Sequence, residues 1–531
     1  MTNNNQIRIC VPVCEQSVAE LLRAFEQAEK AGDAVEIRLD CLDSSEHERA
    51  FSKIVERVRV SDTPTITTLR PAEQGGHHSL DYASRERFWT TQDFSASFLD
   101  IEFDLIEDFA SRAGVPPLDW SRIICSHHDF ACVPDNLAQI YERMANTPAR
   151  ILKIAFQADD VTDCLLAFRL LERARGEARE LIAIAMGSAG IATRILGPSR
   201  GSFLTYGALD EESATAPGQI TATELRELYR IDKIDRYTWI CGLVGHPISH
   251  SVSPHMHNAA FAVSGTRAVY IPFEVCDVGS FLSRMVRPRT RELDWDLRGL
   301  SVTAPHKSAV MDHLDWIDPG ARDIGAVNTI VIDGDALHGY NTDVSAMLQP
   351  VIEKLGPLRD ARCAVIGAGG AARAALWGLR REGASITLVA RNEEKARSLA
   401  ERFAANCEDL SGALFEGFDL IVNATPLGTS GLLEKETPAV SGQLRGARLA
   451  YDLVYNPIDT KFLREAREAG CETLGGVEML VLQAAKQFEL WTGIEAPVRV
   501  MRDAAKSALG AARAQKARVE IANRKFTIDN A

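Results

Sequence analysis

Three features are missing from this 531-residue sequence, and each absence excludes a class of protein. No two cysteines have the Cys-x-x-Cys spacing and the eleven are scattered, so we expect neither a zinc site nor a disulfide framework. The longest uncharged apolar run, residues 181–193, is too short to cross a bilayer. The first residues lack the cationic and apolar regions of a secretory signal. We therefore expect a cytoplasmic protein with no membrane partner.

The sequence also has fewer basic than acidic residues. The net charge of −14 and the pI of about 5.5 argue against nucleic acid or a membrane surface as a partner. A local cluster of arginine and lysine can still bind an anionic small substrate. The length predicts two to four domains, and the 46% hydrophobic and 25% charged fractions are those of globular proteins.

The first half alternates short apolar runs with amphipathic segments that have a helical pattern. The apolar runs are residues 7–13, 34–38, 65–69, 98–101, 122–126, 151–155, 181–186 and 202–206. Eight βα units predict a (β/α)8 barrel. A doubly wound sheet is the alternative, but the even spacing favours closure.

Polar residues stand where these strands should end, which is where such barrels carry their chemistry. They gather arginines, a histidine and a lysine, a set that suits an anionic substrate. They are Glu36, Arg38, Arg70, Glu102, His128, Lys153, Arg194 and Gln219. The alternative for the arginines is ion pairing with Glu36 and Glu102 at the rim, and for His128 it is a structural role.

Lys153 interrupts the apolar run at residues 151–156. Lysine is rarely buried unless it is paired. Desolvation and neighbouring cations lower the pKa of an amine, and a neutral amine can attack a carbonyl. A lysine that reaches past the strand end, or pairs with a carboxylate, is the alternative.

Five motifs of the first half resemble type I 3-dehydroquinate dehydratase, in order. They are Glu36-Ile-Arg-Leu-Asp, Thr68-Leu-Arg-Pro followed by Gly75-Gly76, Ser126-His-His-Asp-Phe, Leu152-Lys-Ile-Ala and Ala216-Pro-Gly-Gln-Ile. The resemblance implies that Lys153 forms a Schiff base with a ketone while His128 transfers protons and water is eliminated. The residues that it implies for substrate binding are Glu36, Arg38, Arg70, Arg194, Thr215 and Gln219.

One position departs from this family. Its members usually have glutamate four residues after the arginine that matches Arg70, where it orients the histidine; here that residue is Gln74, with Glu73 one position earlier. Glutamine can hydrogen-bond an imidazole but cannot stabilise its cation by charge. We expect reduced but surviving activity, or a role for another carboxylate.

A charged run without glycine or proline at residues 225–237 predicts a last helix and a domain boundary near residue 235. Beyond it, polar clusters follow apolar runs in residues 238–345, as loop ends that line a cleft should. Lys307 and Asp343 offer an acid/base pair for carbonyl reduction. A surface salt bridge is the alternative.

Residues 367–373, Gly-Ala-Gly-Gly-Ala-Ala-Arg, lie between an apolar strand and a small-residue helical run. A glycine turn in this context can hold a pyrophosphate against backbone N–H groups and a helix N-terminus. The third small position is Ala372, not glycine, so an ordinary tight turn is the alternative.

The next strand, residues 385–390, distinguishes the two nicotinamide cofactors. An acidic residue at its end would bind the 2′-hydroxyl of NAD, but the strand ends in Ala390 followed by Arg391, with Lys395 close by. A basic residue at this position, with no acidic one, fits the 2′-phosphate of NADP and predicts that cofactor. The alternative is that Arg391 and Lys395 are solvated charges at a helix start.

The second half resembles shikimate dehydrogenase over residues 240 to 500. The motifs include Gly245-His-Pro-Ile-Ser-His-Ser-Val-Ser-Pro, Val302-Thr-Ala-Pro-His-Lys, Gly339-Tyr-Asn-Thr-Asp, Asn423-Ala-Thr-Pro-Leu-Gly and Gly475-Gly-Val-Glu-Met. Ser301 stands where many bacterial members have asparagine, and Ala390 where asparagine commonly precedes the cofactor arginine.

This second resemblance implies Lys307 and Asp343 as the catalytic pair and no metal. The implied substrate residues are Ser251, Ser253, Thr303, Asn328, Tyr455 and Gln483. The implied NADP residues are Gly367, Ala368, Gly369, Gly370, Ala371, Arg391, Lys395, Thr425 and Gly476.

Together the two resemblances imply an α/β protein with two consecutive activities. We expect a dehydratase barrel at 1–235, a shikimate-binding domain at 236–345, a Rossmann-like NADP domain at 346–476, returning helices at 477–512 and a tail at 513–531. Dehydroquinate would lose water to give dehydroshikimate, which NADPH would reduce to shikimate. One alternative is an NAD-preferring quinate/shikimate dehydrogenase fused to a dehydratase in a catabolic direction. Another is a barrel without catalysis, which only Gln74 supports.

Overall fold

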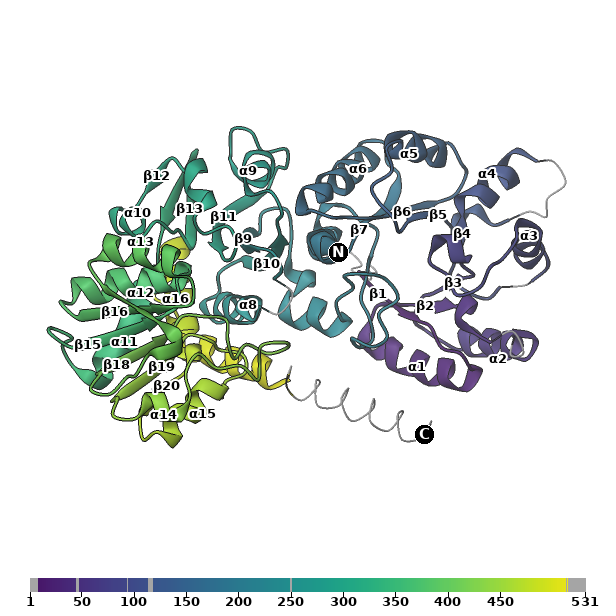
Figure 1. Ribbon diagram of the computed structural model, residues 1–531. Coiled ribbons are helices and arrows are strands. Elements are labelled where there is room, and N and C mark those ends of the chain that lie inside the picture. Colours follow the sequence, from purple (N-terminus) through teal and green to yellow (C-terminus); the bar gives the residue numbers. More distant parts are fainter. Residues whose placement is uncertain are drawn as a thin grey trace.

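The computed structural model describes residues 8–43, 47–92, 94–112, 118–248, 251–511 and 513, without the side chains of 47–51 and 393–395 (Figure 1). In Figure 1 a barrel of strands and helices lies beside a second half that contains two further sheets. Among the described residues, no helix has the length and apolarity needed to cross a membrane.

The first half is an eight-stranded parallel barrel, as predicted. From β1 to β7 each strand pairs with the next in sequence, and β1 also pairs with β8. A bridge between Leu181 of the seventh strand and Ser202, just before the eighth, closes the ring. The strands are β1 (Ile9–Val13), β2 (Ala34–Arg38), β3 (Thr65–Thr68), β4 (Phe98–Glu102), β5 (Ile123–Asp129), β6 (Ile151–Gln157), β7 (Glu180–Met186) and β8 (Thr205–Tyr206).

Side chains point alternately to the outside and the inside of the barrel along these strands, and this gives two separate apolar layers. Ile9, Val11 and Val13 of β1 face the surrounding helices, while Cys10 faces the barrel interior. The helices are amphipathic and pack on the outward layer. They are α1 (Val18–Ala31), α2 (His47–Arg59), α3 (Tyr82–Thr91), α4 (Phe103–Ser111), α5 (Leu137–Ala145), α6 (Cys164–Gly176) and α7 (Ile191–Leu196).

The inward positions become polar toward the C-terminal ends of the strands. In β2 the residues that share the interior face are Ala34, Glu36 and Arg38, and in β6 Lys153 follows Ile151 on that face. The same alternation therefore gives an apolar barrel floor and a charged upper layer.

The junction differs from the helix expected at residues 225–237. Helical residues end at Leu228, Arg230 has a left-handed backbone with φ +51°, and a short turn follows at Ile231–Lys233. Ile231 and Ile234 of this turn are both buried. The left-handed backbone of Arg230 therefore separates the helical residues that end at Leu228 from a second, short turn.

The second sheet is mixed, with the order β10-β9-β11-β13-β14-β12. Its strands are β9 (Trp239–Gly245), β10 (Ala268–Glu274), β11 (Asp296–Val302), β12 (Trp316–Ile317), β13 (Thr329–Asp333) and β14 (Ala336–Tyr340). Helices α8 (Ser253–Ser264) and α16 (Gly476–Thr492) share an apolar cluster with it, and residues 498–511 return to the same cluster as a last described helical segment. The predicted helical stretch beyond residue 511 lies outside the described residues, Arg513 excepted.

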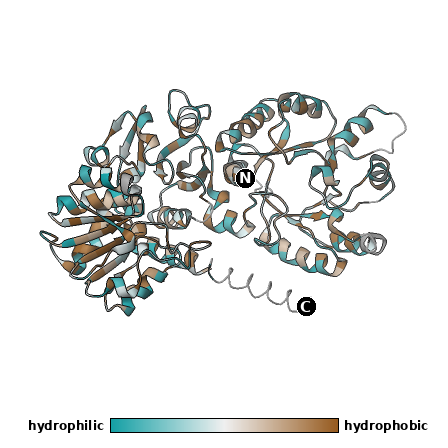
Figure 2. Ribbon diagram, viewed as in Figure 1, coloured by the Kyte–Doolittle hydropathy of each residue, from teal (hydrophilic) through white to brown (hydrophobic). Residues whose placement is uncertain are grey.

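The third sheet is parallel throughout, with the order β17-β16-β15-β18-β19-β20. Figure 2 shows its strands as apolar ribbons between helices whose outer faces are hydrophilic. The strands are β15 (Arg362–Ile366), β16 (Ser385–Ala390), β17 (Asn406–Asp409), β18 (Leu420–Asn423), β19 (Leu449–Asp452) and β20 (Glu472–Leu474). Helices on the two sides include α11 (Asp343–Leu355), α12 (Gly370–Arg381), α13 (Glu393–Phe403) and α15 (Lys461–Glu468). The strand order reverses between β15 and β18, where such sheets bind ligands.

One buried apolar cluster crosses the junction between the two halves. It contains Ile9 and Leu165 of the barrel half together with Ile240, Phe273 and Leu300 of the second sheet. Polar contacts accompany it, since the backbone N–H of Cys276 donates to Asp160 at 2.7 Å. The two halves are therefore packed against each other and not only tethered.

Two candidate active sites

Lys153 lies at the centre of the polar upper layer of the barrel. Its side chain is 6% exposed, and its Nζ donates to Oδ2 of Asp100 at 2.8 Å and to Oε1 of Glu36 at 3.3 Å. Nζ also lies 4.3 Å from the centroid of the Tyr206 ring. The lysine is thus paired with carboxylates inside the barrel, and it faces the cavity described below.

Asp100 was not predicted from the sequence, although it contacts both central cations. Besides Lys153 it binds Nη2 of Arg70 at 2.9 Å, and it is fully buried. Burial raises the pKa of a carboxyl group, but the charges of Arg70 and Lys153 lower the pKa of Asp100 below its usual value. The available signal was an acid in the middle of the strand Phe98–Glu102, but attention to strand ends selected Glu102, the second acid of this strand.

Glu102 has a different environment from that of Asp100. Its carboxylate accepts a hydrogen bond from Arg85 at 3.3 Å, and one oxygen has no partner in the described part of the chain. Burial raises the pKa of Glu102 to about 7, against the lowering effect of Arg70. Glu102 lies behind Arg70 and does not line the cavity described below.

His128 is held by Arg70. Nη1 of Arg70 lies 2.7 Å from Nδ1 of His128, and the guanidinium can only donate, so the neutral imidazole carries its proton on Nε2. Burial lowers the pKa of His128 well below its usual value, and the charges of Arg70 and Lys153 lower it further. The ring is therefore a neutral base at physiological pH.

The remaining predicted substrate residues surround these groups. A cavity of about 50 Å³ is lined by Glu36, Arg38, Arg70, His128, Lys153, Arg194, Thr215 and Gln219. The structure thus brings together every residue predicted for the first site.

Their local bonds fix several of these side chains. Arg38 makes two hydrogen bonds to Asp40, at 2.9 and 2.7 Å. Arg194 comes from α7 and donates to the carbonyl of Pro217 at 3.2 Å. Burial lowers the pKa of Arg194 to about 10, which leaves it cationic at neutral pH.

Gln74 lies on the short turn Ala72–Gln74 between β3 and α3. Its Oε1 is buried and has no hydrogen-bond partner among the residues that the structure describes. This oxygen therefore accepts no hydrogen bond from His128, whose Nδ1 contacts Arg70.

The second site centres on Lys307 and Asp343. Lys307 follows β11, Asp343 begins α11, and Nζ lies 2.6 Å from Oδ2. Nδ2 of Asn328 donates to the other carboxylate oxygen at 2.8 Å. The ammonium is 23% exposed while the carboxylate is 6% exposed, so the pair opens to a cavity rather than to the outer surface.

This cavity has a volume of about 470 Å³ and lies between the second and third sheets. It is lined by the predicted substrate residues Ser251, Ser253, Thr303, Asn328, Tyr455 and Gln483, and by the predicted cofactor residues Ala371, Thr425 and Gly476. Hydroxyl, amide and phenol groups thus line the same cavity as Lys307 and Asp343.

Two residues that support this site were not predicted. Oγ of Ser301 donates to Gln487 at 2.7 Å, and Gln487 donates to the carbonyl of Asn328 at 3.1 Å. Gln487 lies one helical turn after Gln483 on α16, and this spacing was the available signal. The contact explains how a serine is accommodated where related sequences have asparagine.

The glycine loop has the geometry of a pyrophosphate site. Gly367 has φ +115°, and a Cβ there would lie 3.0 Å from the carbonyl oxygen of Ala424. Gly369 caps the N-terminus of α12, and a Cβ on it would meet no atom within 4 Å. A Cβ on Gly370 would lie 3.6 Å from Cδ of Lys307, so the loop borders the catalytic lysine. The residues present therefore fit a dinucleotide.

Other predicted cofactor residues lie at the same edge of the sheet. Thr425 follows β18 and donates to Asn423 at 2.7 Å, and a Cβ on Gly476 would lie 2.6 Å from the carbonyl of Leu453. Arg391 is exposed directly after β16. The side chain of Lys395 lies outside the described residues.

The structure contains one disulfide that the sequence did not predict. Cys14 and Cys41 form it, and their sequence separation of 27 gave no signal. They follow β1 and β2, which are paired parallel strands, so the barrel places them side by side.

Comparison with known proteins matches different families to successive parts of the chain. A model of type I 3-dehydroquinase matches residues 9–236, and one of the shikimate dehydrogenase substrate-binding domain matches 243–330. A shikimate/quinate 5-dehydrogenase model matches 351–454, and a shikimate 5′-dehydrogenase C-terminal model matches 476–506.

Curated relatives cover either the whole chain or its second half. The chain is 34% identical to a bifunctional 3-dehydroquinate dehydratase/shikimate dehydrogenase, chloroplastic, of Arabidopsis thaliana, over 93% of this chain and 83% of that one. It is 42% identical to a shikimate dehydrogenase (NADP(+)) of Moorella thermoacetica, over 52% of this chain and 95% of that one. A crystal structure of shikimate 5-dehydrogenase from Thermus thermophilus, in complex with NADP(H) and shikimate, is 35% identical with a TM-score of 0.46, covering 51% of this chain and 99% of that one.

Proposed function

This chain belongs to the family of bifunctional 3-dehydroquinate dehydratases/shikimate dehydrogenases, and on that premise we propose how its residues divide the work. The barrel is a lyase that dehydrates 3-dehydroquinate to 3-dehydroshikimate. The second half is an NADP-dependent oxidoreductase that reduces 3-dehydroshikimate to shikimate. The observation that carries the residue assignments is the pair of lysine–carboxylate contacts, Lys153 with Asp100 and Lys307 with Asp343, each of which lies at a cavity.

In the barrel, Lys153 is the nucleophile that forms a Schiff base with the substrate ketone. Asp100 holds its ammonium at 2.8 Å, and Glu36, at 3.3 Å from Nζ, is the carboxylate assigned to take the proton that the ammonium must lose. The resulting iminium withdraws electrons from the neighbouring carbon, and neutral His128 removes a proton there. The histidine then returns this proton to the departing hydroxyl group, so that water is eliminated.

The substrate carboxylate and hydroxyls are bound by the groups that line the same cavity. Arg38, Arg70 and Arg194 supply positive charge, and Thr215 and Gln219 supply uncharged hydrogen-bonding groups. Arg70 also fixes the tautomer of His128, which makes it a positioning residue for proton transfer.

In the second half, Lys307 donates a proton to the carbonyl oxygen while the substrate is reduced. NADPH, when bound, supplies the hydride. Asp343 keeps the lysine ammonium oriented at 2.6 Å, and Asn328 holds the carboxylate from its other side. Ser251, Ser253, Thr303, Tyr455 and Gln483 would bind the ring hydroxyls and carboxylate, and residues 367–371 would bind the pyrophosphate.

The predicted domain limits and the cytoplasmic location remain proposals. The limits at residues 235, 345, 476 and 512 are supported by the three separate sheets and by the helical segment that returns at 498–511.

The decisive experiment supplies the chain with 3-dehydroquinate and NADPH and measures both carbon compounds. We expect 3-dehydroshikimate and then shikimate to form, with one NADPH consumed per shikimate. Formation of 3-dehydroshikimate without shikimate would contradict the second assignment. No consumption of 3-dehydroquinate would contradict the first.

Gln74→Glu tests whether this position acts on His128. The pKa of His128 is depressed in the folded protein, so its base form persists as pH falls below the usual histidine value, and the rate is lost only as pH falls through the depressed pKa. A carboxylate nearby would raise that pKa by about one unit or more. The acid limb of the pH–rate profile should therefore move to higher pH, while Glu73→Gln on the same turn should not move it. An unchanged profile for Gln74→Glu would show that the position does not tune the histidine.

Arg391→Ala tests the proposed 2′-phosphate contact. Loss of one charge-assisted contact should raise the KM for NADPH by roughly tenfold and leave the KM for NADH unaltered. Arg381→Ala is the matched control, because Arg381 lies at the end of α12 that is remote from the glycine loop. If the wild type used NADH better than NADPH, the NAD-preferring quinate/shikimate dehydrogenase would be the correct assignment.

A further inference from the structure

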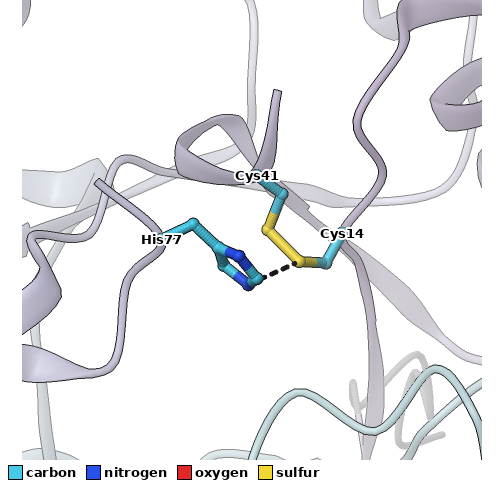
Figure 3. Close-up of side chains that lie close together, drawn as sticks. All are labelled: Cys14, Cys41 and His77. Carbon is cyan, nitrogen blue, oxygen red and sulfur yellow. Dashed lines mark hydrogen bonds between the residues drawn. A yellow bond between two sulfur atoms is a disulfide. The ribbon is translucent and has the colours of Figure 1, made fainter. Parts of the chain in front are cut away.

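Cys14, Cys41 and His77 meet beside the dehydratase cavity without lining it (Figure 3). Cys14 follows β1, Cys41 ends the turn Leu39–Cys41 after β2, and His77 belongs to the segment between β3 and α3. The two sulfurs are bonded, with the Cα atoms 5.3 Å apart, and Nε2 of His77 lies 3.5 Å from Sγ of Cys14. An imidazole next to a disulfide can carry the proton that a cysteine gains on reduction.

The disulfide can be reached from one side. Cys41 is 5% exposed, whereas Cys14 is half-buried and His77 is exposed. A thiol from solution therefore approaches the sulfur of Cys14, the one beside the imidazole. The described residues contain no second disulfide, so this bond is not part of a framework that a small unstable domain would need.

Asp40 connects the disulfide to the substrate-binding arginines. It precedes Cys41 in the same turn and accepts two hydrogen bonds from Arg38, at 2.9 and 2.7 Å. Its two oxygens also accept from the backbone N–H groups of Arg70, at 3.2 Å, and of His77, at 3.3 Å. One buried carboxylate thus holds both arginines and the segment that carries the histidine.

We propose that Cys14–Cys41 is a thiol–disulfide exchange site whose substrate is a dithiol reductant, and that its oxidised form fixes Asp40 for the dehydratase reaction. The proposal rests on the dehydratase assignment of the barrel. Breaking the sulfur–sulfur bond frees the turn Leu39–Cys41 from the end of β1. Asp40 then holds Arg38 less firmly, and substrate affinity falls.

The exchange proceeds in two balanced steps. A thiolate of the reductant attacks Sγ of Cys14, and Cys41 leaves as a thiolate that takes a proton. The second thiol of the reductant then attacks its own sulfur in the mixed disulfide and releases Cys14, which receives its proton through His77. The protein disulfide gains two electrons, the dithiol becomes a disulfide, and both protons come from the dithiol.

The test uses the full chain equilibrated with mixtures of reduced and oxidised dithiothreitol. Mass spectrometry of the linked Cys14 and Cys41 peptides gives the fraction of disulfide, and both activities are measured at each ratio. Reduction should lower kcat/KM for 3-dehydroquinate by roughly tenfold, mainly through KM, because a small displacement of a binding group has effects of this size. Reduction of 3-dehydroshikimate by the same molecules should be unaltered.

Three variants separate this role from a general structural one. Cys14→Ser should stay at the activity of the reduced enzyme under all conditions. His77→Ala should slow the exchange while the two end levels of activity remain the same. Cys132→Ser, which removes an exposed free cysteine of the same barrel, should respond to dithiothreitol as the wild type does.

Four results would overturn the proposal. Equal dehydratase activity in both states is one, and an equal loss in both halves of the chain is another. A third is a Cys14–Cys41 disulfide that stays intact in excess dithiothreitol, whatever dehydratase activity is measured. Stoichiometric binding of zinc by the reduced chain, lost in Cys14→Ser, would make the cluster a metal centre instead. Failure of the oxidised enzyme to dehydrate 3-dehydroquinate would contradict the function of the barrel, which is a separate result.

Discussion

Lys153→Met is expected to lower kcat/KM for 3-dehydroquinate by on the order of 10⁴-fold or more, because no other group can form the Schiff base. Methionine preserves the volume of the side chain in its buried position. Asp100 and Glu36 would lose their common partner, so some loss of thermal stability should accompany the loss of activity. Reduction of 3-dehydroshikimate by the same chain should proceed at the wild-type rate, which provides an internal control for folding.

Borohydride trapping identifies the atom involved. In the wild type, borohydride added with substrate should fix the ligand on the peptide that contains Lys153, seen as a mass increase. Lys153→Arg keeps the positive charge between the two carboxylates but cannot form an imine, so it should be inactive and give no adduct. An adduct on another lysine, or dehydration by the arginine variant, would refute the assigned role.

Lys307→Ala and Asp343→Asn are each expected to lower kcat for the reduction step by about 10²- to 10⁴-fold. Lys307 supplies the proton to the carbonyl oxygen, and Asp343 orients its ammonium at 2.6 Å. Because the two groups act as one unit, the double variant should be little worse than the poorer single variant. The measurement is NADPH oxidation with 3-dehydroshikimate, with dehydration of 3-dehydroquinate as the internal control.

A separate comparison distinguishes this role from a surface ion pair. Lys354 and Glu472 form an exposed pair in the same half of the chain, and Lys354→Ala should leave both activities at wild-type values. Additive losses in the Lys307/Asp343 double variant, or a retained kcat in either single variant, would show that the pair does not deliver the proton.

The barrel could be predicted from the sequence, and so could the gathering of polar residues around Lys153 and Lys307, because these depend on local patterns. Runs of apolar residues mark the strands, and the polar residues at their ends meet at one rim when parallel strands pair. Asp100 was missed because it stands in the middle of β4, and only the pleat shows that it faces Lys153. Gln487 was missed because its partners are Ser301 and the carbonyl of Asn328, which are remote in the sequence.

The disulfide was missed for a related reason. A cysteine spacing of 27 means nothing along the chain, and only the adjacency of β1 and β2 brings the two sulfurs together. The interruption of the expected helix at residues 225–237 was also missed, because a charged run without glycine or proline gives no sign of the left-handed backbone at Arg230.

The apolar cluster that crosses the junction limits how this enzyme can be dissected. A gene cut at residue 235 would leave Ile231 and Ile234 on one fragment and Phe273 and Val275 on the other, all of them covered in the intact chain. Newly exposed apolar surface of this kind promotes aggregation. We therefore expect each half, when expressed alone, to need a more polar surface at the junction in order to stay monomeric.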